Sequence, residues 1–456
     1  MNLRSVLLLG LAAVLATAPA VHAREGTPAV LLVSVDGLHP SYVLQADEFG
    51  LEIPTLRSFI AQGAYSTAVT NVTPTVTYPN HTSIVTGVAP VEHGILTNTV
   101  FDPEGHENGA WNWYGSQIRV PTLWDAAKAG GLTTASVLWP VSVAHAAIDY
   151  NMPEYWRTKK RASDSHLLYA VSTPRGLLET VEGADGLFDP AGNPDPWSFD
   201  ATLTRVALEM IRKGEPQLLT VHLTGLDAVQ HRNGPLPGSA EARRTLEETD
   251  AMIARLIVAH RAVHPELTVV VASDHGFHPV NATIHLNAAF ARAGLIELDE
   301  AGRVTSWKAW SWNSGGSASV VLKDPDDVAT RAAVDAILVA LEADPEGGVS
   351  SVLRGDAALA EGALPGAAFL VDARGGFAMG GALTGDTIRP QAKTTGAHGY
   401  RNSHPEMNAS FFVMGPGVEA GRNLGPIDIR QIAPTVARTL GVSLPSARHA
   451  PLVLAD

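Results

Sequence analysis

The sequence predicts an α/β fold built on a doubly wound, mostly parallel sheet with helices on both faces. Apolar runs typical of strands alternate along the chain with stretches typical of helices, which is the pattern of such a sheet. The run at 29–35 is apolar and partly β-branched, and the run at 267–273 is the clearest strand in the chain. Both suit parallel strands that are buried on their two faces. The 456 residues, 45% of them hydrophobic, are ample for a large core.

The elements follow one another with local start and stop signals. A helix at 54–62 begins with proline and ends before Gly63, and both residues favour those positions. Amphipathic patterns or helix-forming stretches predict further helices at 121–129, 199–212, 239–264, 325–342 and 429–440. Apolar runs predict further strands at 133–139, 217–223, 317–322 and 409–414. Loops are expected at 93–98 and 396–400, and an aromatic cluster at 111–114.

The pattern fits one domain over residues 24–456 with two insertions, near 140–198 and 295–390. The first of these stretches is irregular and rich in Pro, Gly, Asp and Trp. Long stretches of this kind are usually functional loops, so we expect an insertion over the sheet edge or a lid. The second contains Trp307, Trp310 and Trp312, which either pack in a core or shape a pocket.

The first 23 residues are typical of a secretory signal peptide. Arg4 precedes a short apolar run from Ser5 to Ala18, and Val21-His-Ala23 fits a small-residue cleavage site. The run is too short to span a bilayer comfortably, and we expect no membrane span after its removal. With no cysteine in the chain, stability must come from the core rather than from disulfides. The signal, the lack of cysteine and the Ala-rich composition predict a periplasmic or secreted bacterial protein.

The formal net charge of −14 argues against a basic nucleic-acid-binding surface. An acidic protein can still bind a small phosphate ester at a site that metal ions make locally positive. Because the chain has no cysteine, any metal site must use histidine and carboxylate ligands.

The stretch from Asn71 to Gly87 predicts an anion site next to a helix N-terminus. Pro79 is interpreted as the first helical residue and Gly87 as the stop. Thr77 would then lie just before the helix, where free N–H groups and the dipole favour an anion. Its hydroxyl is a candidate nucleophile for attack on phosphorus, although a hydroxyl needs a base or a metal to react at neutral pH. The simpler alternative is that Thr77 only caps the helix.

Three aspartates occur at or near the ends of predicted strands. Asp36 and Asp274 directly follow strands, and Asp227 lies a few residues after a third. The carboxyl ends of parallel strands meet at one edge of the sheet, where ligands of such folds bind. Clustered carboxylates repel one another, so a cation is expected between them.

Histidines complete this set of candidate ligands. His231 is four residues after Asp227, His275 is adjacent to Asp274, and His398 is a further candidate. Six imidazole and carboxylate ligands suit zinc and are enough for two ions. Two such ions stabilise the attacking and leaving oxygens of a displacement at phosphorus. The pairs have simpler explanations too, such as a strand-end turn for Asp274-His275 or a helical i, i+4 pair for Asp227 and His231.

Seven blocks of the sequence stand out: Val33-Ser-Val-Asp36-Gly, Pro74-Thr-Val-Thr77-Tyr-Pro-Asn-His81, Val85-Thr-Gly87, His93-Gly94, Asp227 with His231, Ser273-Asp274-His275-Gly276, and Gly396-Ala-His398-Gly-Tyr400. In type and order they resemble the motifs of the nucleotide pyrophosphatase/phosphodiesterase family of the alkaline phosphatase superfamily. The resemblance implies an alkaline-phosphatase-like fold.

The resemblance implies a role for each matching residue. Thr77 would be the nucleophile and would form a covalent phospho-threonine intermediate. Asp36, Thr77, Asp274 and His275 would hold one zinc ion, and Asp227, His231 and His398 the other. Asn98 would donate a hydrogen bond to a phosphoryl oxygen. Tyr78, in place of the family's usual Phe, would line the leaving-group or nucleoside pocket.

The expected activity is therefore that of a two-zinc phosphodiesterase or nucleotide pyrophosphatase acting on a small phosphodiester or nucleotide. A phosphonate hydrolase similar to phosphonoacetate hydrolase, or a phosphomonoesterase, would use the same ligands. A metal-stabilised binding protein is the alternative that is not an enzyme. A sulfatase is disfavoured, because its Cys/Ser-x-Pro-x-Arg nucleophile motif is absent. The sequence leaves the substrate and the oligomeric state open.

Overall fold

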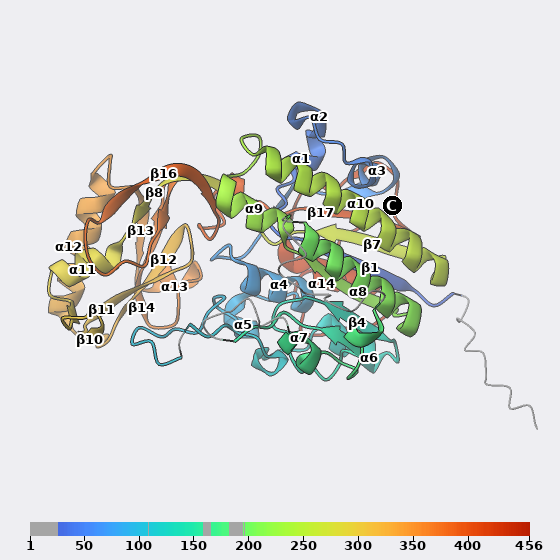
Figure 1. Ribbon diagram of the computed structural model, residues 1–456, viewed down its shortest axis with the longest axis horizontal. Coiled ribbons are helices and arrows are strands. Elements are labelled where there is room, and N and C mark those ends of the chain that lie inside the picture. The colour runs from blue at the N-terminus through green and yellow to red at the C-terminus, as the bar shows by residue number, and fades with distance from the viewer. Residues whose placement is uncertain (1–25, 108, 158–165, 182–194, 196) are drawn as a thin grey trace, which may run out of the picture.

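A computed structural model describes residues 26–107, 109–157, 166–181, 195 and 197–456. The predicted signal peptide at 1–23 and part of the predicted insertion at 140–198 lie outside these residues. The described chain has a larger lobe around the main sheet and a smaller lobe formed by residues 278–397 (Figure 1). The two segments that join the lobes, 273–277 and 398–410, carry or adjoin candidate site residues.

The main sheet has eight strands and is mostly parallel, as predicted. β1 pairs in parallel with β6 on one side and β7 on the other, whereas β17 is antiparallel to β7 and β2. In spatial order the strands are β18 (Arg422–Asn423), β2 (Ala64–Tyr65), β17 (Phe411–Met414), β7 (Leu267–Ala272), β1 (Ala29–Val35), β6 (Leu218–Leu223), β4 (Thr134–Val137) and β5 (Tyr150–Met152). Beside this sheet, β3 (Ala68–Thr70) pairs with β19 (Pro426–Asp428).

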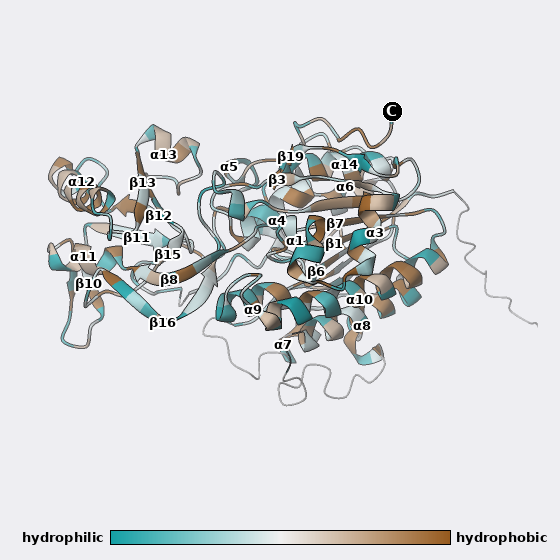
Figure 2. Ribbon diagram, turned by 90° about the horizontal axis from the view of Figure 1, so that it is seen from above, coloured by the Kyte–Doolittle hydropathy of each residue, from teal (hydrophilic) through white to brown (hydrophobic). Residues whose placement is uncertain are grey.

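Helices cover both faces of this sheet because its strands are apolar on both sides. Leu31 and Val33 of β1 face one core cluster, and Val30 and Leu32 face another. Each such fully buried side chain contributes about 1.5–3 kcal/mol relative to exposure. The first face is covered by α3 (Pro54–Gln62), α8 (Ser198–Gly214), α9 (Gly225–Asn233) and α10 (Ala240–Val263), and the second by α4 (Thr77–Thr86), α6 (Leu123–Ala129) and α14 (Ile432–Thr439). Apolar strands lie between these helices in Figure 2.

The smaller lobe has its own apolar core and its own sheets. A four-stranded antiparallel sheet contains β11 (Ala309–Asn313), β12 (Ser317–Leu322), β14 (Ala367–Ala373) and β13 (Val349–Arg354). Beside it lie β15 (Gly376–Met379), β8 (His278–Ile284) and β16 (Ile388–Ala397), and the pair β9 (Ile296–Leu298) and β10 (Val304–Trp307). Its helices are α11 (Leu286–Arg292), α12 (Val328–Ala343) and α13 (Asp356–Ala360). Of its three tryptophans, Trp310 is buried in this core, and Trp307 and Trp312 pack against it.

Two differences from the sequence-based predictions concern the candidate nucleophile and the edge of the main sheet. Helix α4 begins at Thr77 rather than at Pro79, so Thr77 is its first residue. A proline is tolerated at the third position, since the first N–H groups of a helix have no partner within it. The stretch near 140–198 does more than cover the sheet edge, because its residues 150–152 form the edge strand β5. It also contains α7 (His166–Val171).

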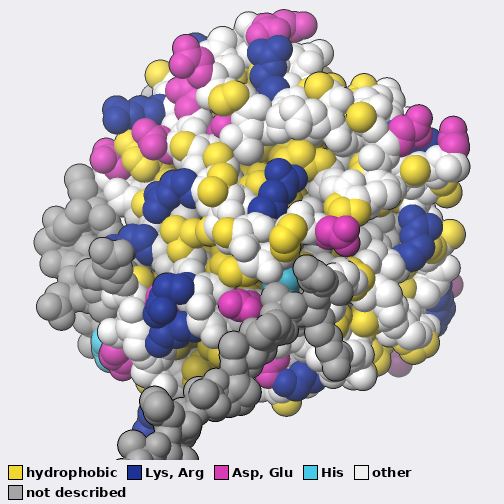
Figure 3. Space-filling model, turned by 90° about the vertical axis from the view of Figure 1, so that its right-hand side faces the viewer, with side chains coloured by type: hydrophobic (Ala, Val, Ile, Leu, Met, Phe, Trp, Pro, Cys, Tyr) yellow, Lys and Arg dark blue, Asp and Glu magenta, His cyan; other side chains and the backbone are white. Residues whose placement is uncertain are grey.

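Further short helices are α1 (Ser41–Leu44), α2 (Ala46–Phe49) and α5 (Pro90–His93). α5 ends at His93, the first residue of the predicted loop at 93–98. Among the described residues, no helix has the length and apolarity that crossing a bilayer requires. On the face of the larger lobe shown in Figure 3, basic and acidic side chains are interspersed.

Candidate metal centre and catalytic site

Three neighbouring strands bring the candidate aspartates together. β6, β1 and β7 are adjacent and parallel, so their carboxyl ends meet at one edge of the sheet. Asp36 follows β1 directly, Asp274 comes two residues after β7, and Asp227 lies in the first turn of α9 after β6. The prediction that these distant carboxylates share one edge agrees with the structure.

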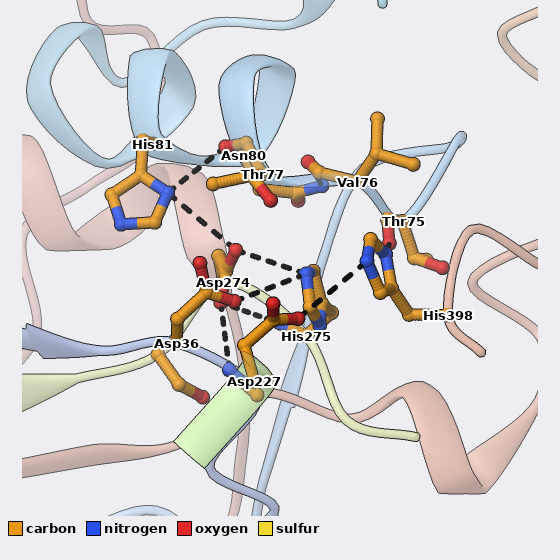
Figure 4. A network of polar contacts seen from close by, with 12 residues as sticks. Asp36, Thr75, Val76, Thr77, Asn80, His81, Asp227, Asp274, His275 and His398 are labelled. Atoms are coloured by element: carbon orange, nitrogen blue, oxygen red, sulfur yellow. Dashed lines mark hydrogen bonds and ion pairs between the residues drawn. The ribbon is translucent and has the colours of Figure 1, made fainter. Parts of the chain in front are cut away.

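One group of candidate ligands surrounds His275 (Figure 4). Its Nε2 lies 3.1 Å from Asp274 Oδ2 and 3.4 Å from Asp36 Oδ1. All three side chains are buried. The second carboxylate oxygen of Asp274 accepts backbone N–H bonds from Gly37 and His275, at 3.2 and 3.0 Å. Those two bonds fix the carboxylate so that Oδ2 faces the group.

A second group forms around Asp227. Its Oδ1 lies 3.3 Å from His231 Nε2 and 3.7 Å from His398 Nε2. The ring of His398 stacks on that of His275, with centroids 3.6 Å apart and planes 10° from parallel. Ligand atoms of Asp227, His275 and His398 all lie within 4.8 Å of one another, as do those of Asp36, Asp274 and His275. The two groups are thus adjacent, and His275 lies between them.

The chemistry of these atoms fits metal ions. Within the described chain, four buried atoms facing this space have no hydrogen-bond partner: Asp36 Oδ1, Asp227 Oδ1, Asp274 Oδ2 and His275 Nε2. Buried polar atoms are rarely left unpaired, since each unpaired group costs about 1–3 kcal/mol or more. Each of these four has a lone pair suited to a divalent cation when the carboxylates are ionised and the imidazole is neutral. The set therefore fits two nearby metal ions.

Burial and neighbouring charges raise the pKa values of the carboxyls in this cluster. A bound cation would offset this effect, because it stabilises the ionised carboxylates. Burial, then the charge of Asp227, raises the pKa of Asp36 well above its usual range. Burial, then the charge of Asp36, raises the pKa of Asp274 in the same way. Burial lowers the pKa of His398 to about 4, which keeps the imidazole neutral and able to bind a metal.

The three histidines are oriented by backbone carbonyls. Nδ1 of His231 donates to Gly396 O at 3.1 Å, and Nδ1 of His398 donates to Thr75 O at 2.9 Å. Nδ1 of His275 lies 3.3 Å from Gly276 O. Because a carbonyl only accepts, the proton sits on Nδ1 and the lone pair on Nε2. Metal-ligating histidines are held by second partners of this kind.

Two further histidines lie beside the cluster and were not predicted as part of the site from the sequence. His222, on β6, places Nε2 2.9 Å from Asp36 Oδ2. His81, on α4, places Nδ1 3.5 Å from Asp274 Oδ2, and its ring is 4.2 Å from that of His222. A histidine within an apolar strand was the available signal for His222. Because both contact a carboxylate of the cluster, we interpret them as its supports.

Asp200 is a third residue that sequence reasoning missed. It is fully buried on α8, and its carboxylate accepts from the N–H groups of Thr224 and Gly225, both at 2.9 Å. Those N–H groups belong to the start of α9, which carries Asp227 and His231. Burial raises the pKa of Asp200 to about 6, so the carboxylate remains largely ionised at neutral pH. The side chain therefore anchors the helix that presents two candidate ligands.

Thr77 is held at the cluster by a rigid helix start. It is half-buried, and in Figure 4 it lies between the first turn of α4 and the Asp/His cluster. Asn80 stabilises the preceding loop: its carbonyl oxygen accepts from Val72 N at 2.8 Å, and its amide donates to the carbonyls of Pro74 and Val76. These bonds give Asn80 a structural role at the start of the helix. The position suits a nucleophile that must meet a bound phosphoryl group.

Asn98 and Tyr78 meet at the same helix end. Asn98 Oδ1 accepts from Tyr78 N at 2.9 Å, which leaves the amino group of Asn98 to donate elsewhere. Pro79 has no N–H, so the N-terminus of α4 offers fewer free backbone N–H donors than the sequence analysis predicted. The ring of Tyr78 is fully buried against Trp111, Ile95 and Val141. Its contact with a substrate remains a prediction.

The fold and this site define an α/β protein with paired metal-ligand groups at the carboxyl edge of its sheet, next to a helix N-terminus. The sequence model for type I phosphodiesterase/nucleotide pyrophosphatase matches residues 30–401. The chain belongs to that family. The match contains all the candidate ligands and Thr77.

Curated relatives share part of this chain. The human ectonucleotide pyrophosphatase/phosphodiesterase family member 1 is 26% identical over 262 residues, which are 55% of this chain and 24% of that protein. Venom phosphodiesterase 2 of Crotalus adamanteus is 24% identical over 264 residues, 55% of this chain and 27% of that protein. The matched regions thus span about a quarter of these two relatives.

Solved structures share the fold. Human ectonucleotide pyrophosphatase/phosphodiesterase 5 superposes with a TM-score of 0.62 at 20% identity, covering 92% of this chain and 96% of that one. The murine protein 5, described as an inactive variant with threonine replaced by alanine and in complex with AMP, gives 0.63 at 18% identity, covering 93% and 97%. These likenesses confirm the predicted alkaline-phosphatase-like α/β fold.

Proposed function

We propose that the protein is a two-zinc hydrolase that cleaves phosphodiester or pyrophosphate bonds of nucleotides or related phosphodiesters through a phospho-threonine intermediate. The observation that carries this proposal is the set of buried, unpartnered ligand atoms on Asp36, Asp227, Asp274 and His275 beside Thr77. Family membership supports the class of reaction. The AMP complex of the murine relative supports a nucleotide as substrate.

The proposed ligand sets follow the two groups of the site. Asp36, Thr77, Asp274 and His275 would hold one zinc ion, and Asp227, His231 and His398 the other. His275 lies within reach of both groups, and we assign it to the first because its Nε2 is closest to Asp274. When bound, zinc ions supply positive charge that lowers the pKa of a ligating hydroxyl and stabilises the phosphoryl oxygens.

In the proposed reaction, the Thr77 oxygen attacks phosphorus, a phospho-threonine bond forms, and the ester oxygen leaves on the opposite side. Water then attacks the same phosphorus and releases Thr77 and the phosphate monoester. The N-terminal dipole of α4 favours the negative phosphoryl group at this point. We assign the amino group of Asn98 as the donor to a phosphoryl oxygen; the carbonyl oxygen of Asn98 accepts from Tyr78 N and leaves that amino group for this role.

We predict that diesters are better substrates than monoesters. Two zinc ions bring four positive charges, and three aspartates with an ionised Thr77 offset them, which suits a monoanionic diester. Monoesterases add Arg, Lys or another metal for the extra charge of their substrate. Within the described chain, the hydrogen-bond and ion-pair partners of the carboxylates of Asp36, Asp227 and Asp274 are histidines, backbone N–H groups and, for Asp36 and Asp274, each other. The charge of Glu154 also contributes to the raised pKa of Asp36.

The measurement is kcat/KM for thymidine 5′-p-nitrophenyl phosphate and for bis-p-nitrophenyl phosphate against p-nitrophenyl phosphate. We expect higher values for both diesters. A higher value for the monoester would assign the protein to the phosphatases instead. Turnover of phosphonoacetate alone would identify a phosphonate hydrolase. Zinc binding without turnover of any of these compounds would indicate a metal-stabilised binding protein.

Two substitutions of Asn98 should separate the effect of its proposed donor group on catalysis from the effect of its acceptor group on stability. Asn98→Ala removes the donor to the phosphoryl group and should lower kcat by about a hundredfold, the usual effect of one lost oxyanion donor. It also removes the acceptor for Tyr78 N, so a small fall in Tm is expected. Asn98→Asp keeps that acceptor but not the donor, and should lose at least as much kcat while Tm is retained. Normal kcat in Asn98→Asp would contradict the donor role.

We also propose that the protein acts in the periplasm or outside the cell after removal of residues 1–23. The proposal rests on the N-terminal sequence pattern. N-terminal sequencing of the protein from a native periplasmic fraction tests it, with Arg24 as the expected first residue. An intact Met1 in the cytoplasmic fraction would contradict it.

A further inference from the structure

A second cluster of metal-type ligands lies at the base of the smaller lobe. It consists of His278, His404 and Glu406, whose ligand atoms all lie within 4.8 Å of one another. His278 is the first residue of β8, and the other two lie in the segment between β16 and β17. The cluster thus connects the two segments of the chain that link the lobes, one leading into β8 and the other running from β16 to β17. We propose that these three residues bind a structural zinc ion that is separate from the catalytic pair.

Two of the three ligand-to-ligand distances match those of a zinc site, and the third, between His404 and Glu406, is at most 4.8 Å. His278 Nε2 lies 3.2 Å from His404 Nδ1 and 3.4 Å from Glu406 Oε2. With zinc–ligand distances near 2.0–2.1 Å, neighbouring ligands of a tetrahedral ion are about 3.3 Å apart. The two measured edges bracket that value. Two imidazoles and one carboxylate leave a fourth position for water.

His404 is oriented as a ligand by a buried carboxylate. Its Nε2 donates to Asp372 Oδ2 at 2.7 Å, and Asp372 is 1% exposed. The proton on Nε2 leaves the lone pair of Nδ1 directed at His278. Carboxylate–histidine–metal arrangements of this kind are a regular feature of zinc sites. Asp372 is fixed in turn by the N–H of Arg401, which donates to Oδ1 at 3.0 Å.

Packing holds the two imidazoles in place. The ring of Tyr400 contacts both, with centroids 4.7 Å from His278 and 5.2 Å from His404. Tyr400 is anchored by its hydroxyl, which donates to Phe377 O at 2.6 Å. A Cβ added at Gly375 would lie 3.2 Å from the ring of His278, so glycine leaves room for this ring. Two of the three ligands are therefore positioned before any ion arrives.

Glu406 supplies the open side of the site. Its side chain is 52% exposed, whereas those of His278 and His404 are 10% and 15% exposed. An ion can therefore enter past Glu406 and exchange water for the two imidazoles. The bound ion would tie β8 to the 404–406 turn. His275 lies three residues before this site and His398 six residues before His404, so the tie would stiffen segments that carry catalytic ligands.

Zinc content measured by mass spectrometry tests the proposal. The purified protein should hold about three zinc ions per chain, whereas Glu406→Ala and His278→Ala should each hold about one fewer. Glu406→Ala changes an exposed side chain, so it decides the question even where His278→Ala does not fold. His106→Ala is the matched control, because His106 and Glu104 form an exposed pair at 2.9 Å that belongs to none of the metal-type groups among the described residues. That variant should keep all the zinc.

A second set of variants distinguishes zinc bound at this site from zinc bound at the catalytic pair. The double variant Asp227→Asn, His398→Ala should lose catalytic zinc yet keep the ion at His278, and adding Glu406→Ala should remove it. Cobalt substituted into the double variant should give the visible absorption of a tetrahedral ion, lost on adding Glu406→Ala. Equal zinc content in Glu406→Ala, His278→Ala and the unaltered protein would overturn the proposal. It would show that His278 and His404 share only a hydrogen bond.

Discussion

Thr77→Ala should lose about a thousandfold or more in kcat on a diester while the fold is retained. The hydroxyl is the group proposed to form the covalent bond to phosphorus, and removing a nucleophile leaves only the contribution of binding and charge. Thr77 is the half-buried first residue of α4, and its backbone carbonyl accepts a hydrogen bond from His81 Nδ1. Alanine at that position should therefore change Tm only slightly. Steady-state kinetics and thermal melting measure the two effects.

Thr77→Ser and Thr86→Ala are the controls for this result. Serine keeps the attacking hydroxyl and should retain part of the activity, together with the phosphorylated intermediate that mass spectrometry of quenched reactions would detect. Thr86 ends the same helix, and its hydroxyl donates to the carbonyl of Thr82, at 2.7 Å. Its replacement by alanine should leave kcat unchanged. Normal turnover in Thr77→Ala would show that another group attacks phosphorus.

The sequence predicted the aspartates of the site because strand ends are readable from local patterns. Apolar runs end where Asp36 and Asp274 begin, and parallel strands place their ends on one edge. The chain order of these strands did not reveal that β1 lies between β6 and β7, which brings the three carboxylates within reach of shared ions. Adjacency of strands depends on tertiary packing rather than on local pattern.

The features of the fold and site that the sequence did not predict depend largely on contacts between segments far apart in the chain. Asp200 holds the start of α9 through two backbone N–H groups that only the folded chain brings to it. The helix start at Thr77 was misplaced by two residues because proline is tolerated throughout the first helical turn. Several antiparallel strands of the smaller lobe, such as β10 and β13, are only partly buried, and such short runs carry weaker patterns than buried parallel strands.

Chelation should abolish diester turnover, and Zn²⁺ should restore it. Without cations the buried carboxylates of Asp36 and Asp274 face each other with unpartnered oxygens, and Thr77 has no group that promotes its ionisation. Asp36→Ala and His398→Ala should each lower both the zinc content and kcat. Full activity in a protein shown to be free of metal would contradict the proposed mechanism.

Removing the metal should also make stability depend on pH, with Tm of the metal-free protein falling as the pH rises through the raised pKa values of the buried carboxyls. Burial and mutual repulsion raise the pKa values of Asp36 and Asp274, so the folded protein binds these protons more tightly than the unfolded chain does. That stabilisation is present at low pH and is lost as pH rises through the folded pKa values. His231, whose pKa is raised beside Asp227 despite its burial, acts in the same direction.

Histidines with lowered pKa values, such as His275 and His398, have the opposite effect, but only below about pH 6.5. Above that pH they are neutral in both the folded and the unfolded chain, so the decline reports the carboxyls and His231. Asp274→Asn removes one buried charge and should flatten the decline in the metal-free protein. Zinc-loaded protein should show no such decline, because the ions neutralise the carboxylates. Identical pH profiles for metal-free Asp274→Asn and the unaltered protein would show that these buried carboxyls do not control stability.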